Sequence, residues 1–189
     1  LRGHYLNQLP IIDISMYEGS CYWTLKRIKL LEWVFPRALE LTYTARDLTL
    51  LANDCGFSGS PFNWDEERRF LLRCELDAAF FHFYLKSNSN GQWGSSNVAE
   101  DPLQDDIFKD LSEADRYFPT PRDAVAYIMD TFTIVKRKDE EKYKEFRTKK
   151  TILDIYDEMA ESMRSGQPYQ THLDPPPADL RCCHASRRS

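Results

Sequence analysis

The chain has 189 residues, a formal net charge of −5, a hydrophobic fraction of 42% and an aromatic fraction of 13%. This length fits one domain, and this apolar content can build a packed core, which excludes a mostly disordered chain. The negative charge excludes a protein that coats nucleic acid through bulk electrostatics, although it leaves room for a local basic surface.

The cysteine spacing and the lack of a long apolar run together predict the cellular compartment. The five cysteines follow no framework spacing, which favours a reducing environment over a disulfide scaffold. We find neither a signal peptide nor an apolar run of transmembrane length. The sequence therefore predicts a cytoplasmic protein without a membrane partner. Because the chain begins at Leu1 without an initiator Met, we expect a fragment of a longer protein.

The N-terminal third predicts an extended lead-in followed by short helices. Residues 4–15 alternate weakly and are interrupted by Pro10, which favours an extended lead-in over residues 1–20. Apolar periodicity then predicts helices, and Pro36 should end or kink the first of them. The expected helices cover residues 23–35, 37–43 and 45–54.

Residues 64–86 should form the central helix of a mainly α-helical domain. At 100° per residue, apolar side chains fall on two sides of this helix and leave only narrow polar seams, Glu75 with His82 and Arg73 with Asp77. A helix that is apolar almost all round is buried, so other elements must pack on both sides of it. Asn63 is positioned to cap its first turn.

The C-terminal half predicts two clearly marked helices and a tail. Thr120 and Pro121 begin a helix that extends to about residue 132, with Thr as the cap and Pro at the first helical position. An amphipathic helix is expected at about 151–164. The long polar connection before them should hold a short helix near residues 102–111. We expect a helical domain over 21–166 and a disordered tail over 167–189.

Residues 136–150 are the best candidate for a functional surface. They hold eight Lys or Arg against four Asp or Glu, so this segment carries +4 and the rest of the chain −9. The competing interpretation is a charged helix that is merely solvated. The candidate DNA-binding residues are Lys136, Arg137, Lys138, Lys142, Lys144, Arg147, Lys149 and Lys150.

A second polar pair is expected to be structural. Arg73 and Asp77 lie one helical turn apart on the central helix. The wheel places Asp77 between aromatic positions, so we expect its carboxylate to be partly buried and to need a cationic partner. Arg73 is the nearest candidate, and Arg147 or Lys149 is an alternative.

Other chemistry-bearing patterns are weak. Glu140 and Lys142 fit part of a metal-dependent nuclease site, which would require them on a buried strand beside another acidic side chain. Residues 182–184, Cys-Cys-His, lack the spacing of a structural zinc site. The proline run at 174–177 resembles a linker more than a catalytic motif, and His82 should be a core residue. We therefore assign no catalytic and no metal-binding residue.

Four segments together resemble a known family. They are LTYTARDL (41–48), WDEERRFLLRCELDAAFFHFYL (64–85), YFPTPRDAVAYIMDTF (117–132) and IVKRKDEEKYKEFRTKKTILDIYDEM (134–159). In this order they resemble the C-terminal region of large type IIG-like adenine-specific DNA methyltransferases, which belong to bacterial restriction–modification and phage-defence systems. The resemblance covers about residues 5–175.

The resemblance implies a parent enzyme that methylates adenine N6 in duplex DNA with S-adenosylmethionine. This chain lacks both the glycine-rich cofactor loop and the N-P-P-Y motif, so no catalytic residue and no cofactor can be assigned to it. QLPII (8–12) resembles the end of the target-recognition region. The implied partners are duplex DNA and the upstream methyltransferase and target-recognition domains, with other defence-system subunits as further candidates. The alternative is a helical module that docks a protein partner without contacting DNA.

Overall fold

The described part of the chain is mainly α-helical. The computed structural model describes residues 14–24, 28–85, 87, 90–94 and 115–185, and over these residues it contains six α-helices, short 3-10 helices and isolated β-bridges but no strand. The mainly α-helical class is therefore confirmed. The α-helices are α2 (Leu30–Thr42), α3 (Thr49–Asp54), α4 (Glu66–Tyr84), α5 (Pro121–Asp130), α6 (Thr133–Tyr143) and α7 (Arg147–Ser165).

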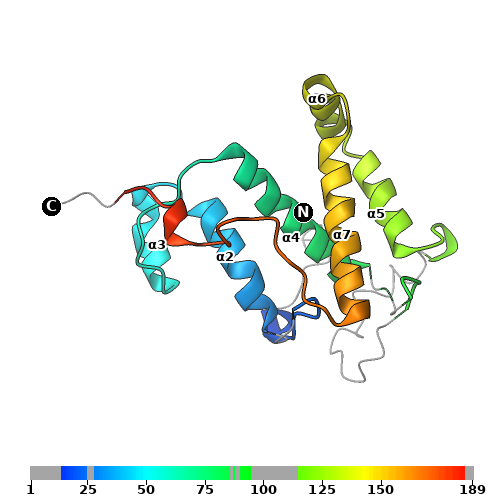
Figure 1. Cartoon of the computed structure of the whole chain (residues 1–189), viewed down its shortest axis with the longest axis horizontal. Helices are drawn as coiled ribbons and strands as arrows, with labels where there is room; N and C mark the ends of the chain where they lie inside the picture. Colours follow the sequence, from blue (N-terminus) through cyan, green and yellow to red (C-terminus); the bar gives the residue numbers. More distant parts are fainter. Residues whose placement is uncertain (1–13, 25–27, 86, 88–89, 95–114, 186–189) are drawn as a thin grey trace, which may run out of the picture.

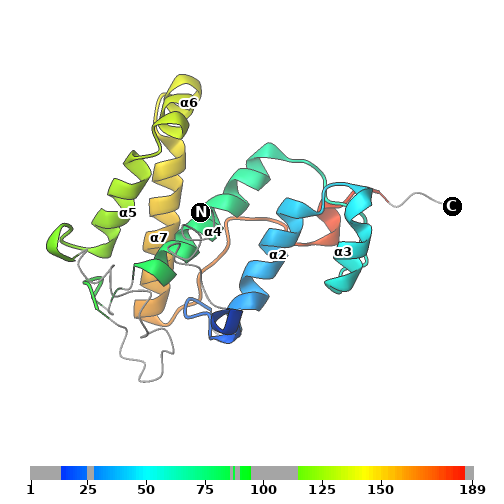
Figure 2. The ribbon, with the colours of Figure 1, turned by 180° about the vertical axis from the view of Figure 1, so that it is seen from behind.

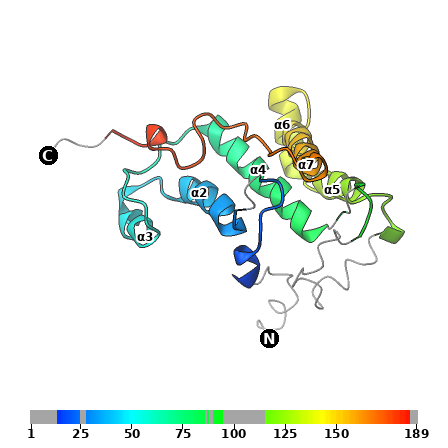
Figure 3. The same cartoon turned by 60° about the horizontal axis from the view of Figure 1, so that its bottom comes forward.

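Helix α4 lies at the centre of the arrangement. It packs against α7 on one side and against α2 on the other, and α5 and α6 pack on α7. Figure 3 shows α4 between α2 and α7, and Figure 2 shows the same order from behind Figure 1. The predicted central helix with neighbours on two sides is confirmed.

The start of α4 differs from the prediction. The capping side chain is Asp65, which accepts a hydrogen bond from the backbone N–H of Arg68 (2.9 Å). Asn63 instead donates its side-chain Nδ2 to the carbonyl of Cys183 (3.1 Å). Asp65 occupies the N-cap position because the helix begins at Glu66, the residue that follows it.

Helix α2 corrects the boundaries predicted around Pro36. The helix begins at Leu30, not at Trp23, and it continues through Pro36 to Thr42. Before the helix, the N–H of Cys21 donates to the carbonyl of Ile28 (2.7 Å), and the N–H of Leu30 donates to the carbonyl of Gly19 (2.8 Å). The proline removes one backbone hydrogen bond, and the burial of neighbouring apolar side chains on both sides of Pro36 offsets that loss.

The remaining helix predictions are largely confirmed. Thr120 caps α5 in a reciprocal capping box with Asp123. Helix α7 buries the expected apolar stripe and ends at Gly166, whose φ of 72° is the left-handed conformation that glycine adopts readily. Residues 46–54 form a 3-10 turn followed by α3. The short helix expected at 102–111 and residues 1–13 of the lead-in lie outside the described residues.

Two apolar clusters form the core. The larger one joins α2, α4, α5 and α7 and includes Trp23, whose ring meets Trp33 edge-on at a centroid distance of 5.3 Å. The smaller one lies at the other end of α2, around Leu39, Tyr43 and Phe62. Residues near the C-terminus, among them Cys182, pack against this smaller cluster.

The C-terminal segment differs most from the prediction. Residues 167–185, which we expected to be part of a disordered tail, run back from the end of α7 across α4 toward α3, as the orange-to-red trace in Figure 1 shows. We call residues 167–185 the C-terminal strap. Residues 186–189 lie outside the described residues.

A buried glutamate on α4 fixes the first half of the strap. The side chain of Glu75 is 0% exposed, and its carboxylate accepts hydrogen bonds from Arg37 Nε (2.7 Å), Tyr169 Oη (2.9 Å), Thr171 Oγ1 (2.6 Å) and the backbone N–H of His172 (3.1 Å). Arg37 comes from α2. One carboxylate therefore joins α2, α4 and the strap.

A second buried carboxylate fixes the other half. Glu40 on α2 forms an ion pair with Arg68 of α4 and accepts a hydrogen bond from the backbone N–H of Ala178 (2.9 Å). The same arginine donates to the carbonyls of Pro175 (2.7 Å) and Pro176 (3.0 Å). Buried charges need hydrogen-bonding partners. The strap provides such partners for Glu75, Glu40 and Arg68, and these hydrogen bonds hold it in place.

We predict that Arg37→Met strongly destabilises the protein. The substitution leaves the Glu75 carboxylate buried without its cationic partner, which typically costs about 3–5 kcal/mol. Urea unfolding measures the change. Arg122→Ala is the matched control, because it breaks an exposed ion pair with Asp157 and should cost less than about 1 kcal/mol. Equal effects of the two substitutions would contradict the importance of the Glu75 network.

Candidate nucleic-acid interface

The predicted basic segment forms the end of a helical hairpin. Helix α6 and the first turn of α7 are joined at Lys144, which adopts a left-handed conformation (φ 64°). Asp139 of α6 is buried and accepts a hydrogen bond from the N–H of Thr148 (2.7 Å), so it stabilises the start of α7. Figure 1 shows this hairpin at one end of the molecule. We call residues 133–150 the basic hairpin.

Half of the eight predicted DNA contacts are held in ion pairs within the chain. Such pairs lower the net positive charge that the basic hairpin presents, although exposed pairs contribute little stability and open readily. The pairs are Arg137 with Glu141 (3.9 Å), Arg147 with Glu67, Lys149 with Asp130 (2.7 Å) and Lys150 with Glu145 (3.8 Å).

Arg147 has a structural role, but its described partner is Glu67 and not Asp77, for which the sequence offered it as an alternative. Its guanidinium pairs with Glu67 on α4 and lies over the rings of Phe70 (4.2 Å) and Tyr143 (4.7 Å). These contacts join α4, α6 and α7 at one point. Lys149 likewise links α7 to α5 through Asp130. Both residues are partly buried, so they are less available to a ligand than the other candidates.

Four lysines of the basic hairpin form no ion pair with any residue that the structure describes. Lys138, Lys142 and Lys144 are exposed, and Lys136 is partly buried. Lys138 and Lys142 lie one helical turn apart on α6. The ammonium of Lys142 lies 4.8 Å from the centroid of its neighbour's ring, Tyr143. Two of these lysines still have a carboxylate nearby, since Glu66 interacts with the charge of Lys142 and Asp130 with that of Lys136.

Arg73 and Asp77 interact through their charges without forming an ion pair: desolvation by neighbouring groups raises the pKa of Asp77 to about 6, and the charge of Arg73 partly offsets that rise. Both residues are exposed on α4, and no ion pair joins them in the part of the chain that the structure describes. The described helices cover the face of α4 that carries Leu72 and Ala79 and leave the face of Arg73 open. The buried polar centre of α4 is Glu75, which the sequence assigned to a seam.

His82 is a core residue, as predicted. Its ring stacks on Tyr156 with a centroid distance of 3.8 Å, and Nε2 is hydrogen-bonded to the carbonyl of the same tyrosine (2.9 Å). Burial lowers the pKa of His82 to about 4, and the backbone hydrogen bond only partly offsets this effect. The imidazole is therefore neutral at pH 7 and serves packing rather than proton transfer.

The nuclease and metal alternatives find no support in the geometry. Glu140 and Lys142 lie on α6, a solvent-exposed helix, and not on the buried strand that the nuclease interpretation requires. Cys182 and Cys183 are free thiols. Over the described ranges, no group of three or more His, Cys, Asp or Glu side chains is placed to hold a metal ion.

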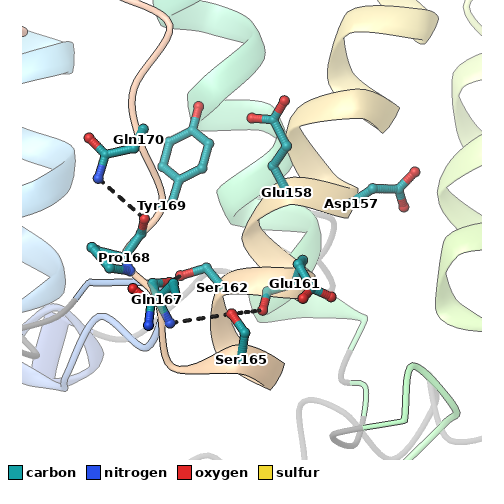
Figure 4. A pocket seen from close by; sticks show the side chains of 9 residues that line it. All are labelled: Asp157, Glu158, Glu161, Ser162, Ser165, Gln167, Pro168, Tyr169 and Gln170. Carbon is teal, nitrogen blue, oxygen red and sulfur yellow. Dashed lines mark hydrogen bonds between the residues drawn. The ribbon is translucent and has the colours of Figure 1, made fainter.

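An open groove of about 480 Å³ lies between the C-terminal half of α7 and the strap. Figure 4 shows Glu158 of α7 beside Tyr169 of the strap, while the side chain of Asp157 points away from the strap. Each carboxylate that lines the groove already has a partner: Asp157 pairs with Arg122, Glu158 with His172 and Glu161 with Arg164. The groove is therefore a satisfied surface feature and not a candidate site.

Comparison with known proteins assigns no family. No protein-family model, no curated protein and no solved structure matches this chain. The resemblance to adenine-specific methyltransferases therefore stays a prediction. Of the helices that the structure describes, none has both the length and the apolar character needed to cross a bilayer.

We predict that His82 makes stability depend on pH. Because its folded-state pKa of about 4 lies below the ordinary value of 6.5, the unfolded chain binds more protons between these values. The unfolding free energy should therefore fall as the pH drops from about 6.5 to 4, by up to about 3 kcal/mol.

His82→Gln provides the comparison, since it removes the titrating group and keeps a side-chain donor. Urea unfolding at several pH values should give a flatter profile for this variant, and the difference from the unmodified protein isolates His82 from other titrating groups. Parallel profiles would contradict the assignment.

Proposed function

We propose that this chain is a non-catalytic helical module that contacts the backbone of duplex DNA through the basic hairpin. The observation that carries the proposal is the set of exposed lysines without an ion pair to a described residue at one end of the molecule, Lys138, Lys142 and Lys144 above all. Lysine ammonium groups suit phosphate oxygens as point charges. Contacts of this kind position a protein on DNA but do not specify a sequence.

The parent enzyme in this proposal is an adenine-specific DNA methyltransferase of a restriction–modification or phage-defence system. The module would support target recognition, while upstream domains bind S-adenosylmethionine and perform the methyl transfer. The proposal rests here on the sequence resemblance.

A protein-docking module is the second candidate, and one observation favours it. Large apolar side chains are exposed where α5 meets α6: Tyr127 (58%), Phe132 (50%) and Ile134 (63%). Single exposed apolar residues are ordinary, whereas a group of them is typical of interaction surfaces. Under this alternative, Ile134→Asp would abolish partner capture and leave DNA binding unchanged.

We predict weak, salt-dependent binding to duplex DNA. At physiological salt the Kd should lie in the range of about 10⁻⁴–10⁻⁶ M that is typical of non-specific contacts. Replacing Lys138, Lys142 and Lys144 by Gln should weaken binding at low salt. It should also reduce the slope of log K against log salt by about 3, since each lost phosphate contact reduces it by about 1. Fluorescence anisotropy at several salt concentrations measures both.

A matched control separates local contacts from bulk charge. Lys29→Gln, Arg46→Gln and Arg164→Gln remove the same number of charges at exposed positions outside the basic hairpin. This control should keep the salt slope of the unmodified protein. Equal losses in both triple variants, or no binding to duplex DNA at low salt, would contradict the proposal and favour the docking alternative.

A further inference from the structure

An exposed tryptophan is held rigidly at the start of α4. The side chain of Trp64 is 60% exposed. Its Nε1 donates a hydrogen bond to Glu66 (2.6 Å), and the guanidinium of Arg69 lies over one ring face at 3.8 Å from the centroid. The indole is thus fixed on one face and at one edge, and its large exposure leaves the opposite face open.

Two arginines follow Trp64 along the same side of α4. Arg69 is anchored by a hydrogen bond from Nη1 to the carbonyl of Leu41 (3.0 Å). Arg73 lies one turn further, is exposed and forms no ion pair with the residues described. Burial, and then the nearby charge of Arg73, lower the pKa of Arg69. Glu66 and Glu40 partly offset the charge of Arg69, and Asp77 interacts with the charge of Arg73. A bound anion would further reduce the repulsion between the two guanidiniums.

The surface around Trp64 continues into the basic hairpin through cation–aromatic contacts. Arg147 pairs with Glu67, and it lies over Phe70 of α4 and over Tyr143 of α6, while Lys142 lies beside the same Tyr143 ring. The carboxylates of Glu66 and Glu67 are both engaged within this surface. The ion pair with Arg147 offsets the charge of Glu67, whereas the neutral indole N–H of Trp64 orients the Glu66 carboxylate without neutralising it.

We infer that Trp64, with Arg69 and Arg73, forms a stacking site for an unpaired base of single-stranded nucleic acid. The inference rests on the proposed function and extends it to a substrate class. An unpaired base would lie on the open face of the indole, and Arg73 and Lys142 would contact the flanking phosphates. A base inside a duplex is already stacked on its neighbours, so this site distinguishes single strands or unpaired regions from intact duplex.

Fluorescence anisotropy with a labelled oligothymidine of about 12 nucleotides, within the range of single-strand site sizes, tests the inference against a blunt duplex. Trp64→Ala should weaken single-strand binding by about 5- to 150-fold, the equivalent of the 1–3 kcal/mol that one stacked base contributes. Duplex affinity should change by less than about twofold, because the bases of a duplex are already stacked and do not use the indole. Tyr117→Ala, which removes another exposed aromatic ring (75%), is the matched control and should change neither.

Two further variants keep the test independent of stability effects. Trp64→Phe retains a flat ring and should preserve much of the single-strand affinity, while Arg73→Gln should reduce the salt slope by about 1. Oligothymidine should also quench the tryptophan fluorescence of the unmodified protein, and this quenching should disappear in Trp64→Ala. Circular dichroism melts of each variant confirm that it is folded.

The outcomes separate this inference from the proposed function. If duplex binding depends on the hairpin lysines while Trp64→Ala leaves oligothymidine binding unchanged, the stacking site is overturned and the duplex contact stands. If oligothymidine binding depends on Trp64 but neither ligand responds to the lysines, the stacking site stands and the hairpin contact is overturned. Absence of binding to either ligand at low salt overturns both.

Discussion

The arrangement of the helices depends on the buried carboxylate of Glu75. A fully desolvated charge in the middle of α4 is tolerated only if several donors surround it. Arg37 provides the countercharge from α2, and the strap provides two hydroxyl groups and a backbone N–H. These requirements fix the distance between α2 and α4 and hold the strap against both. Burial of apolar surface drives the collapse, whereas the carboxylate selects one arrangement of the collapsed elements.

The same logic explains which parts of the fold the sequence could predict. Apolar periodicity and capping residues are local signals, so α4, α5 and α7 were predicted with their approximate bounds. The strap could not be predicted, because its proline-rich sequence resembles a linker and its partners, Glu40 and Glu75, are about a hundred residues away along the chain. One available signal was overlooked. Glu75 is followed by Ala78 and Ala79, small residues that indicate a close helix contact around a carboxylate.

The candidate interface was predictable as a segment but not in its details. Composition alone identified residues 136–150 as basic. It could not show that Glu67 and Asp130, both distant in sequence, neutralise Arg147 and Lys149. Nor could a helical wheel decide which face of α4 the other helices cover, and so Arg73 was assigned to a buried pair although it is exposed. Ion pairs between residues distant in sequence therefore decide which cations hold the fold together and which remain free to contact a ligand.

Charged groups in this protein therefore fall into two classes with different consequences. Arg37 and Arg68 are desolvated, and each is matched by a carboxylate and by backbone groups, so a change at either position affects folding. Lys138 and Lys142 remain solvated and make no described ion pair, so their charge contributes little to folding beyond the interaction of Lys142 with Tyr143 and Glu66. Adjacent positive charges on one helix repel each other slightly. The positive charge of this pair is therefore exposed to solvent and is not used to hold the helices together.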